Sequence, residues 1–217
     1  MSAGGGLRLP AARILVFAKA PVAGACKTRL IPALGAEGAA ALHRELVIDT
    51  LARLEPARIA PLELWCAPDT GHPLFGALAA RFGISLHVQP AGDLGARLLA
   101  AAQDALTRAG AVVLIGCDCP GLGPAQVAAA LAALDGVAGA DAVLGPADDG
   151  GYVLLGLKRA EPALFTDVPW GGERVAAVTR ERMAALGWRW TELPTLADLD
   201  RPEDLGKLKR LPRPMVP

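Results

Sequence analysis

Groups of opposite charge follow two apolar segments of the chain. The Lys-Thr-Arg sequence at residues 27–29 comes after the apolar run 13–19, across a loop with proline and glycine, and Asp118 comes almost directly after the apolar run 111–116. Lysine and arginine side chains neutralise phosphate oxygens. Carboxylates hold hard divalent cations that bridge two phosphates. Together these residue types predict a site for a phosphorylated ligand and a divalent ion.

More carboxylates stand at comparable places in the C-terminal half. Asp148 and Asp149 stand in a loop before the apolar run 152–157, and Asp198 and Asp200 stand near the end of the chain. Ligands of open parallel sheets bind beyond the carboxyl ends of the strands. We therefore expect these acids and the cations of the first loop to converge on one edge of a sheet.

Each of these residues also has a purely structural interpretation. Lys27 and Arg29 are about as consistent with solvated surface charges as with phosphate binding. Asp118 is about as consistent with a cap for the helix that begins near Pro124 as with metal binding. An Asp-Asp-Gly-Gly sequence is by itself typical of a turn. Asp200 is expected to cap the last helix whatever else it does. Taken one at a time, Lys27, Arg29 and Asp118 leave both interpretations open, and the Asp-Asp-Gly-Gly sequence favours the turn.

The elements that must position these groups alternate along the chain. Apolar runs predict strands over 13–19, 61–66, 84–88, 111–116, 141–145, 152–157 and 188–193. Helical spacing and caps predict helices over 35–54, 72–82, 94–109, 125–134, 173–186 and 202–209. This alternation predicts an α/β fold with a mostly parallel sheet covered on both faces. The hairpin-like Asp-Asp-Gly-Gly connection predicts that the second half breaks the parallel pattern.

Composition bounds the class of protein. Of 217 residues, 53% are hydrophobic, which is enough for a sizeable core, and the 22 basic and 22 acidic residues balance, which argues against a broad nucleic-acid-binding face. We expect a disordered leader at 1–10, one domain at 11–210 and a tail at 211–217. There is no apolar run long enough for a membrane span and no signal peptide. A cytoplasmic protein with reduced cysteines is the simplest interpretation.

Five segments in order resemble a family of bacterial GT-A-fold proteins that are similar to nucleotide-diphospho-sugar transferases. They are FAKAPVAGACKTRL at 17–30, GCDCPGL at 116–122, LGPADDGGYVLLGL at 144–157, VPWGGERV at 168–175 and DLDRPEDL at 198–205. More distantly, KTRL and the last segment resemble guanylyltransferases of molybdopterin and deazaflavin cofactor synthesis. The resemblance implies a Rossmann-like GT-A fold, a three-layer α/β/α arrangement with a mixed, mostly parallel central sheet.

The resemblance also implies roles for particular residues. Those that bind the nucleotide and its phosphates would be Lys19, Lys27, Thr28 and Arg29. Those that hold Mg²⁺ or Mn²⁺ would be Asp118, Asp200 and Asp198. The acceptor side would be lined by Gly150, Gly151, Tyr152 and Trp170, with Asp149 as first and Glu173 as second candidate for the base that deprotonates the acceptor. Cys119 stands where the family commonly has serine or an acid.

Three functions are compatible with this set of residues. The first is transfer of a sugar from a nucleotide-diphospho-sugar to a small acceptor, with a metal ion stabilising the departing nucleotide. The second is nucleotidyl transfer from a nucleoside triphosphate to a phosphorylated small molecule, with release of pyrophosphate. The third is nucleotide binding without catalysis.

The Ala-rich helix at 125–134 could pack in a homodimer.

Overall fold

The structure is a computed structural model that describes residues 6–136 and 139–208. Its centre is a seven-stranded sheet in the order β3-β2-β1-β4-β6-β5-β7. The strands are β1 (Ala12–Lys19), β2 (Leu62–Ala67), β3 (Ser85–Val88), β4 (Ala111–Ile115), β5 (Ala142–Pro146), β6 (Tyr152–Leu157) and β7 (Trp190–Glu192). Every predicted strand is present, and no strand end differs from the prediction by more than two residues.

Six of the seven strands run in the same direction. β1 is parallel to both β2 and β4, β2 is parallel to β3, and β5 is parallel to β7. β6 is antiparallel to both of its neighbours, β4 and β5. The Asp-Asp-Gly-Gly turn joins β5 to β6 as a hairpin, which confirms the expected mixed sheet. The carboxyl ends of β1 and β4 consequently lie side by side at one edge.

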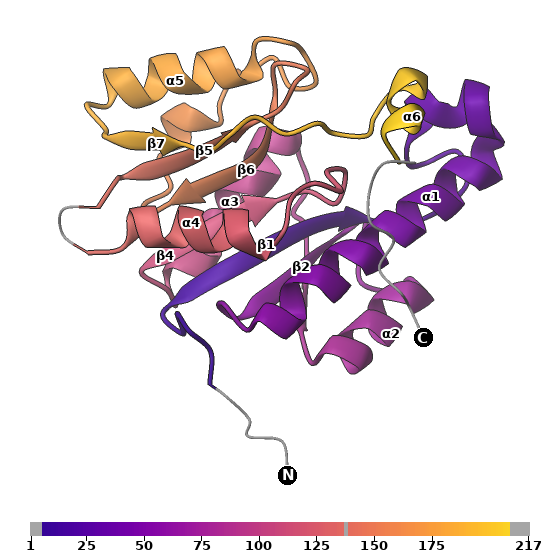
Figure 1. Ribbon diagram of the computed structural model, residues 1–217, viewed down its shortest axis with the longest axis horizontal. Helices are drawn as coiled ribbons and strands as arrows, with labels where there is room; N and C mark the ends of the chain where they lie inside the picture. The colour runs from indigo at the N-terminus through magenta and orange to yellow at the C-terminus, as the bar shows by residue number, and fades with distance from the viewer. Residues whose placement is uncertain (1–5, 137–138, 209–217) are drawn as a thin grey trace.

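Helices cover both faces of the sheet (Figure 1). They are α1 (Ile31–Leu54), α2 (Pro73–Phe82), α3 (Leu94–Leu106), α4 (Pro124–Leu134), α5 (Val175–Ala185) and the short α6 (Leu205–Leu208). The predicted caps are present where they were most clearly signalled: Asp93 Oδ1 accepts from Ala96 N at 2.8 Å, and Pro124 begins α4. α1 begins four residues earlier than predicted, and non-helical backbone at Gly35 divides it there.

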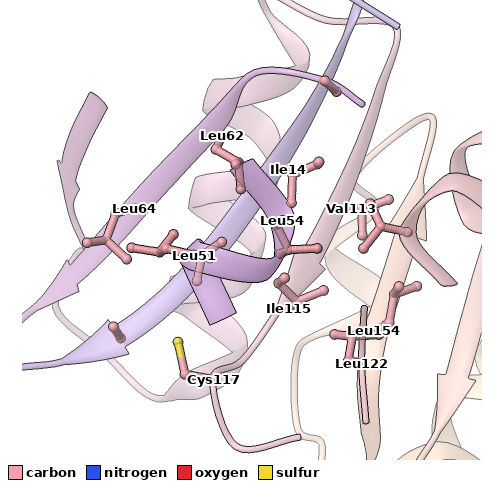
Figure 2. Packing of buried hydrophobic residues seen from close by; sticks show 14 of the residues in the cluster. Ile14, Leu51, Leu54, Leu62, Leu64, Val113, Ile115, Cys117, Leu122 and Leu154 are labelled. Atoms are coloured by element: carbon pink, nitrogen blue, oxygen red, sulfur yellow. The ribbon is translucent and has the colours of Figure 1, made fainter. Parts of the chain in front are cut away.

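Two hydrophobic layers hold this arrangement together. On one face α1, α2 and α4 pack on the sheet, and Figure 2 shows Leu51 and Leu54 of α1 close to Ile14 of β1 and Ile115 of β4. On the other face α3 and α5 pack over a second cluster that includes Leu15. Successive strand residues alternate between the two faces, so one strand supplies both layers. The layers fix the strand ends that carry the polar residues.

The first described residues contact the body of the fold. Arg8 and Leu9 donate backbone hydrogen bonds to the carbonyls of Arg58 and Ile59, at 2.9 and 2.7 Å, so this part of the expected leader is held against the fold. Residues 1–5 of that leader and the expected tail at 211–217 lie outside the described residues. No helix in the described part of the chain combines the length and apolarity of a membrane span.

Candidate functional site

A cleft of about 540 Å³ opens at the carboxyl ends of β1 and β4. Most of the sequence-predicted site residues line it: Lys19, Lys27, Thr28, Arg29, Asp118, Asp149, Gly151, Tyr152, Trp170, Asp198 and Asp200. They come from five segments that are far apart in the chain. The sheet order explains the convergence, because β1 and β4 are neighbours and the β5–β6 hairpin follows beside them.

Lys27 is buried at the floor of the cleft, contrary to the interpretation as a solvated charge. Its Nζ lies 2.8 Å from Asp118 Oδ1 and 3.6 Å from Asp200 Oδ1, and it donates to the carbonyl oxygen of Leu199. Its side chain is only 3% exposed. The cationic loop after β1 therefore faces the acid after β4 across one shared space, as the sequence predicts.

Arg29 lies at the mouth of the cleft and forms an ion pair with Asp200. The N-cap residue of the last helical segment is Arg201, so Asp200 does not cap that segment as we expected. Asp204 supplies that cap instead, because its Oδ2 accepts from the backbone nitrogens of Asp200 and Arg201 at 3.1 and 2.8 Å. Capping by Asp204 leaves the Asp200 carboxylate directed at the two cations.

Asp118 is not a helix cap either. The N-cap of α4 is Gly123, so the Asp118 side chain has no part in starting that helix. The backbone carbonyl of Asp118 accepts a hydrogen bond from Leu199 N at 2.8 Å, which fastens the C-terminal segment across the end of β4. This contact brings Asp198 and Asp200 beside Asp118.

Asp149 takes part in the predicted turn and also lines the cleft. Its Oδ1 accepts from Gly151 N at 2.8 Å, which closes the turn between β5 and β6. It also lines the cleft and an adjoining hollow of about 240 Å³. Glu173 lines this hollow and not the cleft, and Gly150 packs against the backbone of Glu173 instead of facing the cleft. The structure thus does not bring Gly150 and Glu173 to the acceptor wall where we expected them.

The adjoining hollow is strongly acidic. Its lining consists of Asp148, Asp149, Glu173, Asp198, Asp200, Arg201 and Asp204. The pKa of Asp198 is raised from its ordinary value of 3.8 to about 6, mainly by burial and in addition by the charges of Asp149, Asp200 and Asp204, while Lys27 opposes the shift. Asp198 therefore exchanges its proton near neutral pH, which is a property suited to a general base.

We expect Asp198→Asn to stabilise the fold at pH 8 and to have little effect near pH 4. Between about pH 4 and 6 the folded state binds more protons than the unfolded state at this residue, so stability falls as the pH rises through that window. Because the residue is only half-buried, the gain above pH 6 is about 1 kcal/mol, a rise of roughly 2–4 °C in unfolding temperature. Thermal unfolding at both pH values measures it, and an equal shift at both would contradict the raised pKa.

Tyr152 and Trp170 form an aromatic corner of the cleft. Their rings meet edge to face with centroids 6.3 Å apart. Burial raises the pKa of the Tyr152 hydroxyl well above its usual range, so the group stays a neutral donor. Within the described residues, neither Tyr152 OH nor Trp170 Nε1 has a hydrogen-bond partner. This corner is therefore an apolar wall with two unused donors.

Apart from its cysteines, three polar residues of the cleft wall were not predicted as site residues. His43 of α1 lies with Nε2 3.0 Å from the carbonyl of Lys19, and burial lowers its pKa. Gln89 donates to the carbonyls of Ala18 and Trp65 at 3.3 and 2.8 Å. Arg97 lies in the first turns of α3 and donates to Gly92 O at 2.9 Å. Arg97 could have been found, because a helix that follows a parallel strand starts at the same sheet edge.

Carboxylates of the cleft supply part of a donor set for a divalent cation. No group of three or more His, Cys, Asp or Glu side chains within residues 6–136 and 139–208 is arranged as a complete metal site. Asp118 and Asp200, however, already contact one common cation, the ammonium of Lys27. Mg²⁺ is commonly held by one or two carboxylates together with phosphate oxygens of the substrate. Two carboxylates around a shared cationic position fit such an ion.

Comparison with protein families and curated proteins gives one match. The profile of a family described as uncharacterized proteins conserved in bacteria (DUF2064) matches residues 50–172. A search of curated proteins finds no match to the chain.

Solved structures show the same fold. A protein from Desulfovibrio desulfuricans G20, provisionally described as a nucleotide-diphospho-sugar transferase, is 33% identical with a TM-score of 0.83, over 93% of this chain and 87% of that chain. A cytidylyltransferase from Leptospira borgpetersenii is 16% identical (TM-score 0.59; 92% and 85% covered). Glucosyl-3-phosphoglycerate synthase from Mycobacterium tuberculosis, in complex with Mn²⁺, UDP and glucosyl-3-phosphoglycerate, is 14% identical (TM-score 0.54; 93% and 76% covered). The fold is therefore the GT-A-like fold that the sequence predicts.

Proposed function

Because this chain belongs to the bacterial protein family DUF2064, and because its cleft joins phosphate-binding cations to carboxylates, we propose that it is a metal-dependent transferase that uses a nucleotide-activated donor. Sugar transfer from a nucleotide-diphospho-sugar to a small acceptor is the reaction we favour. The observation that carries the proposal is the ion-pair cluster of Lys27, Asp118 and Asp200 at the carboxyl ends of β1 and β4. It provides both signs of charge that a pyrophosphate and its cation require.

The loop after β1 is the proposed phosphate-binding segment. Arg29 is half exposed at the cleft mouth, and a guanidinium there can bind phosphate oxygens in a bidentate manner. Thr28 adds a hydroxyl donor beside it, and Lys19 adds a charge at the end of β1. These donors would neutralise the charge that develops on the departing nucleoside diphosphate.

Asp118 and Asp200 would hold the divalent ion. Bound there, Mg²⁺ or Mn²⁺ would act as a Lewis acid for the departing diphosphate. Asp198 lies beside them with a pKa of about 6. Asp198 lines both the cleft and the adjoining hollow, so it belongs to the same acidic wall.

A base for the acceptor hydroxyl would come from the wall that the cleft shares with the acidic hollow. Asp149 and Asp198 line both spaces, whereas Glu173 lines the hollow alone. Asp149 stays our first candidate for the base, and Asp198 replaces Glu173 as the second. Tyr152 and Trp170 would pack against the acceptor's apolar face.

The shared acidic wall is the observation that favours sugar transfer over nucleotidyl transfer. A phosphate acceptor is already a nucleophile at neutral pH and needs positioning and charge neutralisation more than a base. A second anion beside Asp149 and Asp198 would also meet unfavourable charge. A neutral hydroxyl acceptor meets neither obstacle and uses the base that the wall offers.

Product analysis tests the proposal. The purified protein is first screened by thermal shift with nucleotides and nucleotide sugars in Mg²⁺ or Mn²⁺, because a ligand of the folded state raises the unfolding temperature. Donors that bind are then incubated with candidate acceptors. We expect release of a nucleoside diphosphate. Release of pyrophosphate would establish nucleotidyl transfer instead, and binding without any turnover would make the protein a nucleotide-binding protein.

A further inference from the structure

The ammonium of Lys27 lies where the two proposed metal ligands meet. It is 2.8 Å from Asp118 Oδ1 and 3.6 Å from Asp200 Oδ1, and it also contacts the carbonyl of Leu199. Its side chain is almost completely enclosed, whereas that of Arg29 is half exposed and contacts Asp200 alone of the two acids. One internal cation therefore already lies within ion-pair distance of both carboxylates.

The backbone at Lys27 is shaped to place the side chain there. Its φ and ψ of 47° and 40° are in the left-handed region, which is unfavourable for residues with a Cβ. Strained backbone of this kind persists where the surrounding structure imposes it, often at functional sites. Here the strain turns the side chain inward at the start of the segment that holds Thr28 and Arg29.

We propose that Lys27 is an internal counter-cation that exchanges places with the divalent ion. In the free protein its ammonium neutralises Asp118 and Asp200; when the ion binds, the ammonium leaves that position and moves toward the phosphate-binding side of the cleft. Two cations cannot share the same carboxylate oxygens at contact distance without strong repulsion. The inference rests on the proposed function, because it takes these two carboxylates as the ligands of the ion.

The exchange predicts that Lys27 suppresses binding of the metal alone. Mn²⁺ binding is measured by calorimetry, without nucleotide, for the wild-type protein, Lys27→Gln and the matched variant Arg29→Gln. Both variants remove one positive charge beside Asp200, but only Lys27 contacts both acids. We expect Lys27→Gln to bind Mn²⁺ at least tenfold more tightly than the wild type, and Arg29→Gln to change the affinity less than threefold. Equal gains in the two variants, or no measurable binding by Lys27→Gln, would overturn the exchange.

A second measurement uses the wild-type protein and covers the case in which Lys27→Gln does not fold. Acetic anhydride labelling followed by mass spectrometry reports the accessibility of each lysine. The enclosed Lys27 should label slowly in the free protein and several-fold faster with Mn²⁺, while the exposed Lys19 labels at the same rate in both. An unchanged rate at Lys27 in the presence of bound Mn²⁺ rejects the exchange. Such a result would not contradict the proposed transferase activity, because product analysis tests that activity separately.

Discussion

Asp118→Asn should reduce metal-dependent turnover by about 10³-fold or more, because the variant loses the charge that would hold the ion on which the leaving group depends. Asparagine has nearly the same shape, so it preserves the packing at the end of β4 and the backbone hydrogen bond from Leu199. The loss should appear mainly in kcat at saturating donor. Steady-state kinetics over a range of Mg²⁺ and Mn²⁺ concentrations measures it, with the unfolding temperature recorded in parallel.

Asp104→Asn is the matched control for this variant. The side chains of Asp104 and Asp118 are equally exposed, at 47%, and each forms a close ion pair, at 2.7 and 2.8 Å. Asp104 lies on α3 and pairs with Arg108, outside the lining of the cleft. We expect its replacement to leave turnover unchanged. Metal-dependent turnover that survives in Asp118→Asn would remove Asp118 from the metal site and end the case for this ion-pair cluster as the catalytic centre.

Much of the fold and of the cleft could be predicted, because short stretches of sequence are enough to indicate where the strands and helices begin and end. The apolar run at 111–116 and the breaking residues after it fixed the end of β4, and with it the place of Asp118. Alternation of strands with helices implied parallel neighbours, so residues that follow strands had to reach one edge. The ordered resemblance then selected among alternatives that single residues left open.

The rest depended on contacts between segments far apart in the chain. The burial of Lys27 arises from Leu199 and Asp200, more than 170 residues later, and no local property of Lys-Thr-Arg distinguishes a buried ammonium from a solvated one. The displacement of Glu173 from the cleft has the same origin. The loop before α5 packs on the turn between β5 and β6, a contact that neither sequence segment signals alone.

Gly150 is the point of that contact, and Gly150→Ala should destabilise the protein by about 3 kcal/mol, roughly 10 °C in unfolding temperature. Its φ of 87° lies in the left-handed region, and a Cβ there would be 2.0 Å from the carbonyl oxygen of Glu173. Backbone atoms form the obstacle, so no side-chain rotation can relieve it. The hydrogen bond from Ala176 N to Gly150 O, at 2.9 Å, would be strained as the two segments separate. Chemical denaturation measures the loss.

Gly83→Ala separates the two causes. Gly83 ends α2 with a φ of 63°, but a Cβ there would meet nothing within 4 Å, so only the conformational cost remains, about 1 kcal/mol. The difference between the two variants therefore reports the close packing of the turn against Glu173. Because this turn carries Asp149 and Tyr152, Gly150→Ala should also weaken acceptor binding in the folded fraction, whereas Gly83→Ala should not. Equal destabilisation by the two substitutions would mean that the turn does not pack against the segment before α5, and that Glu173 is free to reach the cleft after all.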